Sequence, residues 1–310
     1  MENITVLTNP DQKYWDDLVK HVVVEEGWIN STHDYKAFKD SFSDGNFILL
    51  VAVDKDSQEF IGSVCVATYT EPEPLSSIGM YYVLPSYQGK GIGSYLFKEA
   101  IKLCAPRKFL YGVENMMPKY RDVFGFNKIP DWHLVTARME NRKVKPLKLN
   151  HDPTLVVKPP EACGWDEIAK YYRKFLPYLD ASALIKSLLT EPQVHCGVAV
   201  TNENRIVSLV RVRETYNNEL SIGPLLGNDA IAACTALRHV LCRLETLRQF
   251  KSIVMQFPNT NSEVHNFLNQ MVDDGDYKIG GVTYPQFTDQ ILEVPIQHIY
   301  AVSQNDIAIV

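Results

Sequence analysis

Residues 83–96 combine three glycines with a lysine, and these residue types at this spacing could bind an anion. The stretch reads VLPSYQGKGIGSYL, with its glycines at 89, 91 and 93 between a β-rich run and a helix-like run. Glycine allows positive φ and close approach of a ligand to the backbone, and a helix N-terminus presents free N–H groups. Gln88 and Lys90 could add side-chain donors. The predicted chemistry is a pyrophosphate held by residues 88–94, with an ordinary glycine-rich connection as the alternative.

The strand before this turn is expected to separate from its neighbour in the sheet. Pro85 cannot donate a hydrogen bond to a β-ladder, so the chain should leave the sheet there. The separation would expose backbone groups of Tyr82 and Val83 and open a gap for a ligand. The glycine spacing matches neither the dinucleotide fingerprint nor the nucleoside triphosphate loop.

The elements that must position the turn follow from the residue pattern around it. Residues 3–8 are typical of a strand, 10–27 of a helix and 28–42 of a loop. A hairpin pattern and a third strand follow, and then a helix and a strand after the turn. These four segments are 46–70, 76–85, 94–104 and 107–114.

The second part of the chain repeats this plan after a linker rich in lysine and proline, residues 140–160. It contains a hairpin, a strand, a helix and a strand, at 194–216, 220–227, 229–247 and 250–257. Its turn lacks the lysine and two of the glycines, and it places Asp229 at the helix start, where a carboxylate would repel a phosphate. The sequence therefore predicts an α+β fold of two similar modules, 1–145 and 155–310. Each would be a mixed, mainly antiparallel sheet flanked by helices, and only the first would bind the anion.

Composition narrows the class of protein. The 310 residues are 45% hydrophobic, enough for two domains, and the longest apolar runs are far shorter than the roughly 20 residues of a membrane span. Six cysteines without a C-x-x-C pair predict reduced thiols, a cytoplasmic location and no metal site. A formal charge of −6 without a basic block argues against nucleic acid as a partner.

Residues 83–96 resemble motif A of the GNAT N-acetyltransferases, V-x-P-x-[YF]-[QR]-G-x-G-[IV]-G, with every position filled. EEGWINSTHDYKAF and PKYRDVFGF resemble the subgroup with a degenerate C-terminal GNAT-like domain of the YitH/HolE type. The resemblance implies transfer of an acetyl group from acetyl-CoA to an amine, more readily of a small molecule than of a protein. The implied coenzyme contacts are Tyr82, Val83, Gln88, Gly89, Lys90, Gly91, Ile92, Gly93 and Ser94.

Acyl transfer to an amine needs an acid, a base and an oxyanion donor, and the resemblance suggests residues for each. The N–H of Val83 could stabilise the oxyanion. Tyr120 could protonate the departing thiolate, although the family's usual slot holds Arg121, and packing is the alternative. Glu114 could be the base, or else a solvated turn residue.

The acceptor site has weaker candidates. His33 and Asp34 match a W-x-x-x-x-H-D signature of the subgroup and could line it, while the alternative is helix capping by Asp34 with His33 exposed. Trp28 and Tyr81, with Tyr82, could form an aromatic pocket or belong to the core. The alternative to an enzyme is a non-catalytic acetyl-CoA sensor or interaction protein.

Overall fold

The computed structural model describes residues 3–42, 45–273, 276–303 and 305–307. The strands of the first half, up to residue 145, are β1 (Ile4–Thr8), β2 (Phe47–Asp54), β3 (Phe60–Tyr69), β4 (Leu75–Val83), β5 (Arg107–Val113) and β6 (Leu134–Glu140). Its helices are α1 (Gln12–Glu25), α2 (Asp34–Ser41), α3 (Ile92–Leu103) and α4 (Met117–Phe124).

The second half, from residue 155, repeats this arrangement of strands and helices. Its strands are β7 (Val156–Lys158), β8 (Val194–Val200), β9 (Ile206–Glu214), β10 (Glu219–Gly227), β11 (Ser252–Pro258), β12 (Lys278–Phe287) and β13 (Ile299–Ala301). Its helices are α5 (Trp165–Tyr172), α6 (Ser182–Thr190), α7 (Ala230–Arg243) and α8 (Ser262–Met271). No helix in the described part of the chain is both long and apolar enough to span a membrane.

The segment 28–42, expected to be a loop, contains the helix α2, and that expectation was wrong. The helix buries Tyr35 and Phe38, which lie one turn apart on the same face. The ring of Tyr35 stacks on Trp15 of α1 at 5.4 Å, and the ring of Phe38 meets Trp15 edge-on at 5.7 Å. Burial of this face stabilises a helix too short to form by its own propensity.

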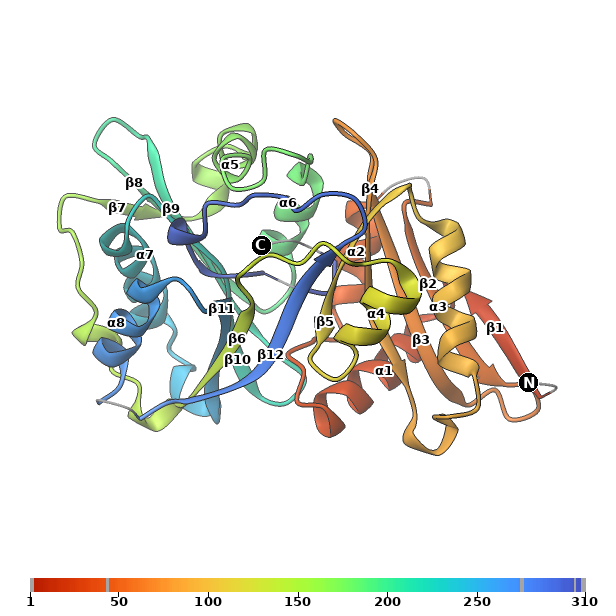
Figure 1. The fold of residues 1–310 in the computed structure, drawn as a ribbon. Helices are drawn as coiled ribbons and strands as arrows, with labels where there is room; N and C mark the ends of the chain where they lie inside the picture. The colour runs from red at the N-terminus through yellow and green to blue at the C-terminus, as the bar shows by residue number, and fades with distance from the viewer. Residues whose placement is uncertain (1–2, 43–44, 274–275, 304, 308–310) are drawn as a thin grey trace.

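The strands of both halves form one continuous sheet, in which β6 of the first half and β12 of the second half are exchanged (Figure 1). The order is β1-β2-β3-β4-β5-β12-β6-β11-β10-β9-β8-β7, with β13 paired to β10. In Figure 1 the blue β12 passes between β5 and the yellow-green β6. Antiparallel pairs join β5 to β12, β12 to β6, and β6 to β11. The predicted mixed and mainly antiparallel sheets are therefore present, but they are joined through these two exchanged strands.

Candidate active site

The site begins where β4 and β5 separate. The two strands pair in parallel from Leu75 with Arg107 to Ile78 with Leu110, and the pairing then stops although both strands continue. A β-bulge lies at this point in β4, since one extra residue lies between the partners of Ser63 and Cys65, and Met80 has φ 48°. The gap between β4 from Gly79 and β5 from Tyr111 onward is called the first wedge. A bulge bends its strand, so the two strands separate at the bulge. The sequence analysis had expected the chain to leave the sheet later, at Pro85.

The glycine turn lies at the wide end of the first wedge. After β4 the chain forms a 3₁₀ turn, Pro85–Tyr87, and Gly91 is the N-cap of α3 with φ 84°. A side chain at Gly89 or at Gly91 would meet no atom within 4 Å, so space is open beside both backbones. Gly93 is different, because a Cβ there would lie 2.5 Å from the hydroxyl of Tyr81. The turn thus combines an open backbone surface with the free N–H groups of a helix start.

A cavity of about 640 Å³ extends from this turn along the first wedge and into the space between the two halves. Of the residues predicted for the site, ten line it: Trp28, Tyr81, Tyr82, Val83, Gln88, Gly89, Gly91, Gly93, Ser94 and Tyr120. Residues from the far half also line it, among them Gln256, Gly281, Val282, Thr283, Ser303, Asn305 and Asp306. The cavity is therefore built by both halves.

Tyr120 reaches the cavity from α4 through the aromatic core below α3. It is 6% exposed, and its ring lies 5.3 Å from that of Phe97 and 6.4 Å from that of Tyr81. Burial, with a smaller effect of Tyr81, raises the pKa of the Tyr120 phenol above its usual value. Among the described residues, none forms a hydrogen bond with this hydroxyl. Tyr120 therefore presents a protonated phenol to the cavity.

Tyr82 and Gln88 use their side chains within the protein rather than in the cavity. The Tyr82 hydroxyl donates to the carboxylate of Glu25 on α1, while the neighbouring Tyr81 points to the α3 side and contacts Phe97. The Gln88 amide donates to the carbonyl oxygen of Val83 at 2.9 Å. On its backbone, Tyr82 pairs with Ser63 of β3 on one side and has no β5 partner on the wedge side.

Three predicted residues lie near the site but do not line the cavity. The Lys90 ammonium lies 5.0 Å from the centre of the Tyr87 ring. Ile92 is buried in the core under α3. Glu114 is exposed in the turn after β5, whereas its neighbours Val113 and Asn115 do line the cavity.

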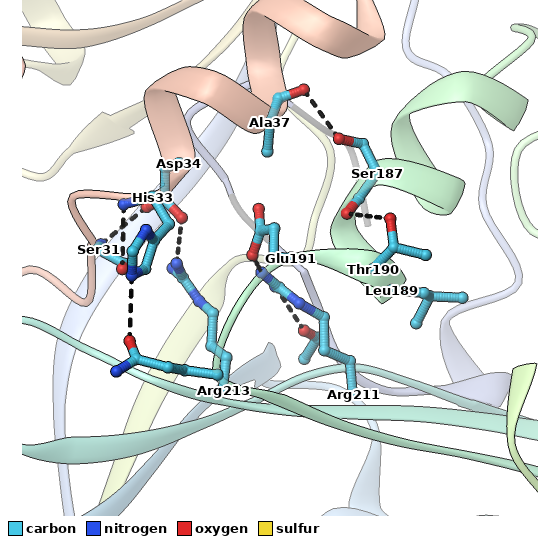
Figure 2. Close-up of polar contacts among 12 residues, drawn as sticks. Ser31, His33, Asp34, Ala37, Ser187, Leu189, Thr190, Glu191, Arg211 and Arg213 are labelled. Carbon is cyan, nitrogen blue, oxygen red and sulfur yellow. Dashed lines mark hydrogen bonds and ion pairs between the residues drawn. The ribbon is translucent and has the colours of Figure 1, made fainter. Parts of the chain in front are cut away.

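His33 and Asp34 also lie outside the cavity lining, and Figure 2 shows where they point. Asp34 is fully buried, where its carboxylate accepts from the guanidinium of Arg213 on β9 and from the backbone N–H of Ser31 at 2.8 Å. His33 contacts the side chain of Gln193 through Nε2 at 3.1 Å. Asp34 therefore joins the two halves and supports the loop that carries Trp28 and Asn30 to the cavity wall.

The second half has a corresponding separation of strands, but its own chain fills it. β10 pairs with β11 only up to Ile222 with Met255, and a β-bulge follows. β13 then pairs with β10 through Leu225 and Leu226, and the N–H of Val302 donates to Gln256 of β11 at 2.8 Å. This gap between β10 and β11, called the second wedge, is closed by β13. At the adjacent helix start, the Asp229 side chain is the N-cap of α7 and accepts from the N–H of Ala232 at 2.8 Å.

Comparison with known proteins decides the family. Residues 15–121 match the model of the Acetyltransferase (GNAT) family. This part of the chain is a GNAT domain. GNAT domains are acyltransferase domains, and the family implies acetyl-CoA as the cosubstrate. Membership in the subgroup of the YitH/HolE type stays a prediction.

One protein is similar to most of the chain in sequence, and solved structures share its fold. The chain is 25% identical over 255 residues, 75% of each chain, to the uncharacterized protein F36G3.2 of Caenorhabditis elegans. It resembles the structure of a proposed acetyltransferase from Pyrococcus horikoshii, with a TM-score of 0.69, 13% identity and coverage of 99% and 97% of the two chains. It also resembles a tandem GNAT protein from the clavulanic acid biosynthesis pathway, with a TM-score of 0.63, 13% identity and coverage of 92% and 98%. The fold is that of tandem GNAT proteins.

Sequence reasoning missed Asn30 and Asp306, both of which line the cavity. Asn30 lies inside the W-x-x-x-x-H-D signature, between Trp28 and His33, so its position was a usable signal. Asp306 lies in the short segment SQNDIAIV, which has no motif. Only the fold brings it to β4, more than two hundred residues earlier in the chain.

Proposed function

We propose that this chain transfers the acetyl group of acetyl-CoA to an amine of a small molecule, and that the coenzyme binds only in the first half. The observation that supports this is the contrast between the two wedges. The first wedge is open along a cavity of about 640 Å³, whereas β13 occupies the second. A coenzyme arm and β13 would compete for the same backbone groups of β10.

The first wedge offers the groups that each part of acetyl-CoA requires. The pyrophosphate would lie against the open backbones of Gly89 and Gly91, where the α3 N-terminus supplies N–H donors and a favourable dipole. The pantetheine arm would lie along β4 from Gly79 to Val83, a segment that pairs with β3 on one side and has no β5 partner on the other. The acetyl group would then point towards the narrow end of the wedge.

The chain's own groups can assist each bond change. The neutral amine nitrogen attacks the thioester carbonyl, and the oxygen that becomes negative needs a donor, which the unpaired backbone N–H groups of β4 can supply. The carbon–sulfur bond then breaks, and the thiolate takes a proton from Tyr120. The nitrogen proton released on amide formation restores the phenol. Because burial keeps the Tyr120 phenol protonated, it is a donor throughout the neutral pH range.

The cavity suits a small acceptor rather than a protein surface. Its volume falls in the range of about 300–1,000 Å³ that is usual for small-ligand sites, and both halves enclose its acceptor end. Its wall includes hydroxyl and amide groups, such as those of Thr136, Gln256 and Ser303.

Coenzyme binding is tested by calorimetry with acetyl-CoA on Gly91→Val and on the matched control Gly164→Val. Both glycines are helix N-caps with positive φ, 84° and 82°, and both have open space around them. Gly91 has ψ −8°, in the left-handed helical region, where valine should cost roughly 1–3 kcal/mol of backbone strain. Gly164 has ψ 131°, where side chains are tolerated less, so the control should be strained at least as much. Only Gly91→Val should lose acetyl-CoA binding, because its side chain would fill the phosphate position. Equal affinities in the two variants would contradict the proposed site.

Turnover is tested by the release of free thiol from acetyl-CoA with a panel of primary amines. The panel should include diamines, amino acids and amino sugars, with acetyl-CoA alone as the background. Release that depends on an amine supports an enzyme. Tight coenzyme binding without such release would favour a sensor.

A further inference from the structure

Residues 305–307, which come after β13 in the chain, lie at the narrow end of the first wedge. A Cβ on Gly79 would lie 1.9 Å from the carbonyl oxygen of Asp306, so these two backbones are in direct contact. The Ser77 hydroxyl donates to the same oxygen at 3.2 Å, and the Tyr69 hydroxyl donates to the carbonyl oxygen of Ile307 at 2.7 Å. The backbone around Asp306 is thereby fixed against β4 at the point where β4 and β5 separate.

The Asp306 carboxylate lines the cavity and has capacity for a ligand. Its Oδ2 accepts from the Asn30 amide at 2.7 Å. Within the described part of the chain, Oδ1 has no hydrogen-bond donor. The carboxylate is half-buried at the acceptor end of the cavity.

Few other charges face this cavity. Apart from Asp306, the described lining residues with a formal charge are Glu26 and Lys119. The other lining residues are neutral, some polar, such as Thr136 and Gln256, and some apolar, such as Ile78 and Met80. A cationic group entering the acceptor end therefore meets carboxylates in a region with little competing positive charge.

We propose that Asp306 is the general base of the reaction, and that the acceptor is an alkyl primary amine that enters as its ammonium ion. The inference rests on the proposed acetyl transfer. Asp306 Oδ1 would accept a hydrogen bond from the ammonium and take one proton from it, which leaves a neutral amine with a lone pair facing the thioester. The products are the acetamide, free coenzyme A thiol and protonated Asp306, which releases its proton to solvent.

The protonation behaviour of Asp306 suits this role. Burial raises the pKa of Asp306 to about 6, and the nearby carboxylate of Asp34 acts in the same direction. The hydrogen bond from Asn30 and the charge of Arg213 oppose the shift. The other titratable group that couples to Asp306 is the buried Cys65 thiol of β3, whose own pKa is raised, mainly by burial. Asp306 is therefore ionised at pH 7 and is a stronger base than an ordinary aspartate.

The test compares Asp306→Asn with wild type and with Glu293→Gln. Asparagine keeps the backbone contacts and can still accept from Asn30, so the variant should fold, as its melting temperature and an unchanged acetyl-CoA affinity would verify. Glu293 is an exposed carboxylate on the same C-terminal segment, and its loss controls for the change in net charge. With the best amine of the panel, Asp306→Asn should lose roughly 10²- to 10⁴-fold in kcat/KM at pH 7, and Glu293→Gln should match wild type.

The pH profile separates a base from a merely structural residue. In wild type, kcat/KM should fall about tenfold per unit below pH 6, because protonated Asp306 cannot take the ammonium proton. In Asp306→Asn this limb should disappear, and kcat/KM should rise with pH up to the pKa of the amine itself. A loss below threefold, or an acid limb that remains in the variant, would overturn the inference while leaving the acetyltransferase intact. A wild-type protein that binds acetyl-CoA but acetylates no amine would overturn the proposed function and this inference with it.

Discussion

Replacing Asp34 by alanine should show whether the buried pair with Arg213 holds the two halves together (Figure 2). Arg213 is 2% exposed, and in Asp34→Ala its guanidinium would keep only the carbonyl oxygen of Ile29, at 2.7 Å, as a described partner. Removing one member of a buried ion pair costs about 3–5 kcal/mol, since it leaves an uncompensated charge. At about 2 °C per kcal/mol for a chain of this size, the melting temperature should fall by roughly 6–10 °C.

The assay is a double-mutant cycle in which the melting of each variant is measured by calorimetry. Asp34→Ala combined with Arg213→Met removes both charges and keeps an apolar side chain of similar length, so the double variant should melt above the single one. The acetyl-CoA affinity should not change, because the glycine turn is not in contact with the pair. The KM for the acceptor amine should rise severalfold, because the loop with Asn30 loses the anchor at Ser31.

Two results would refute this reasoning. A single variant that loses less than about 1 kcal/mol would behave like one with a broken surface ion pair, which would mean that water reaches Arg213. A double variant no more stable than Asp34→Ala would mean that the uncompensated charge of Arg213 is not what destabilises the single variant.

Two further predictions concern single side chains in the two halves. Tyr120→Phe should lower turnover by roughly 10²- to 10⁴-fold with little change in coenzyme affinity or melting temperature, because the hydroxyl has no described protein partner to lose; a loss under threefold in steady-state assays would remove Tyr120 from the mechanism. Asp229→Ala should cost about 1 kcal/mol as a lost N-cap and leave acetyl-CoA binding by calorimetry unchanged; weaker binding would argue for a coenzyme site in the second half.

The glycine turn could be predicted from sequence because its signal is local. Alternating apolar residues, a proline and glycines at fixed spacing define a strand, a turn and a helix within residues 76–104. The start of the first wedge could not be predicted in the same way. It depends on the bulge at Met80, a non-glycine residue with positive φ, and no local pattern indicates such a residue.

The acceptor end of the site is built from residues that lie far apart in the sequence, and the sequence analysis predicted fewer of them. His33 and Asp34 were predicted to line the acceptor site, but charge and spacing alone did not reveal that Arg213 lies opposite Asp34. The position of Asp306 depends on where β13 ends, and β13 pairs with β10 across a bulge. Contacts of this kind follow from strand order, which residue periodicity does not specify.

The exchange of β6 and β12 makes the repeated halves inseparable as folding units. A fragment ending at residue 145 would leave β5 with a bare edge and β6 without β11 or β12, its partners in the sheet. Bare edges of this kind pair with other chains and promote aggregation. The repeat should therefore unfold in one cooperative transition, and two separately produced fragments should regain a coenzyme site only when mixed. By the same geometry, two copies of a single ancestral half could have completed their sheets by exchanging their last strands, as a strand-swapped homodimer.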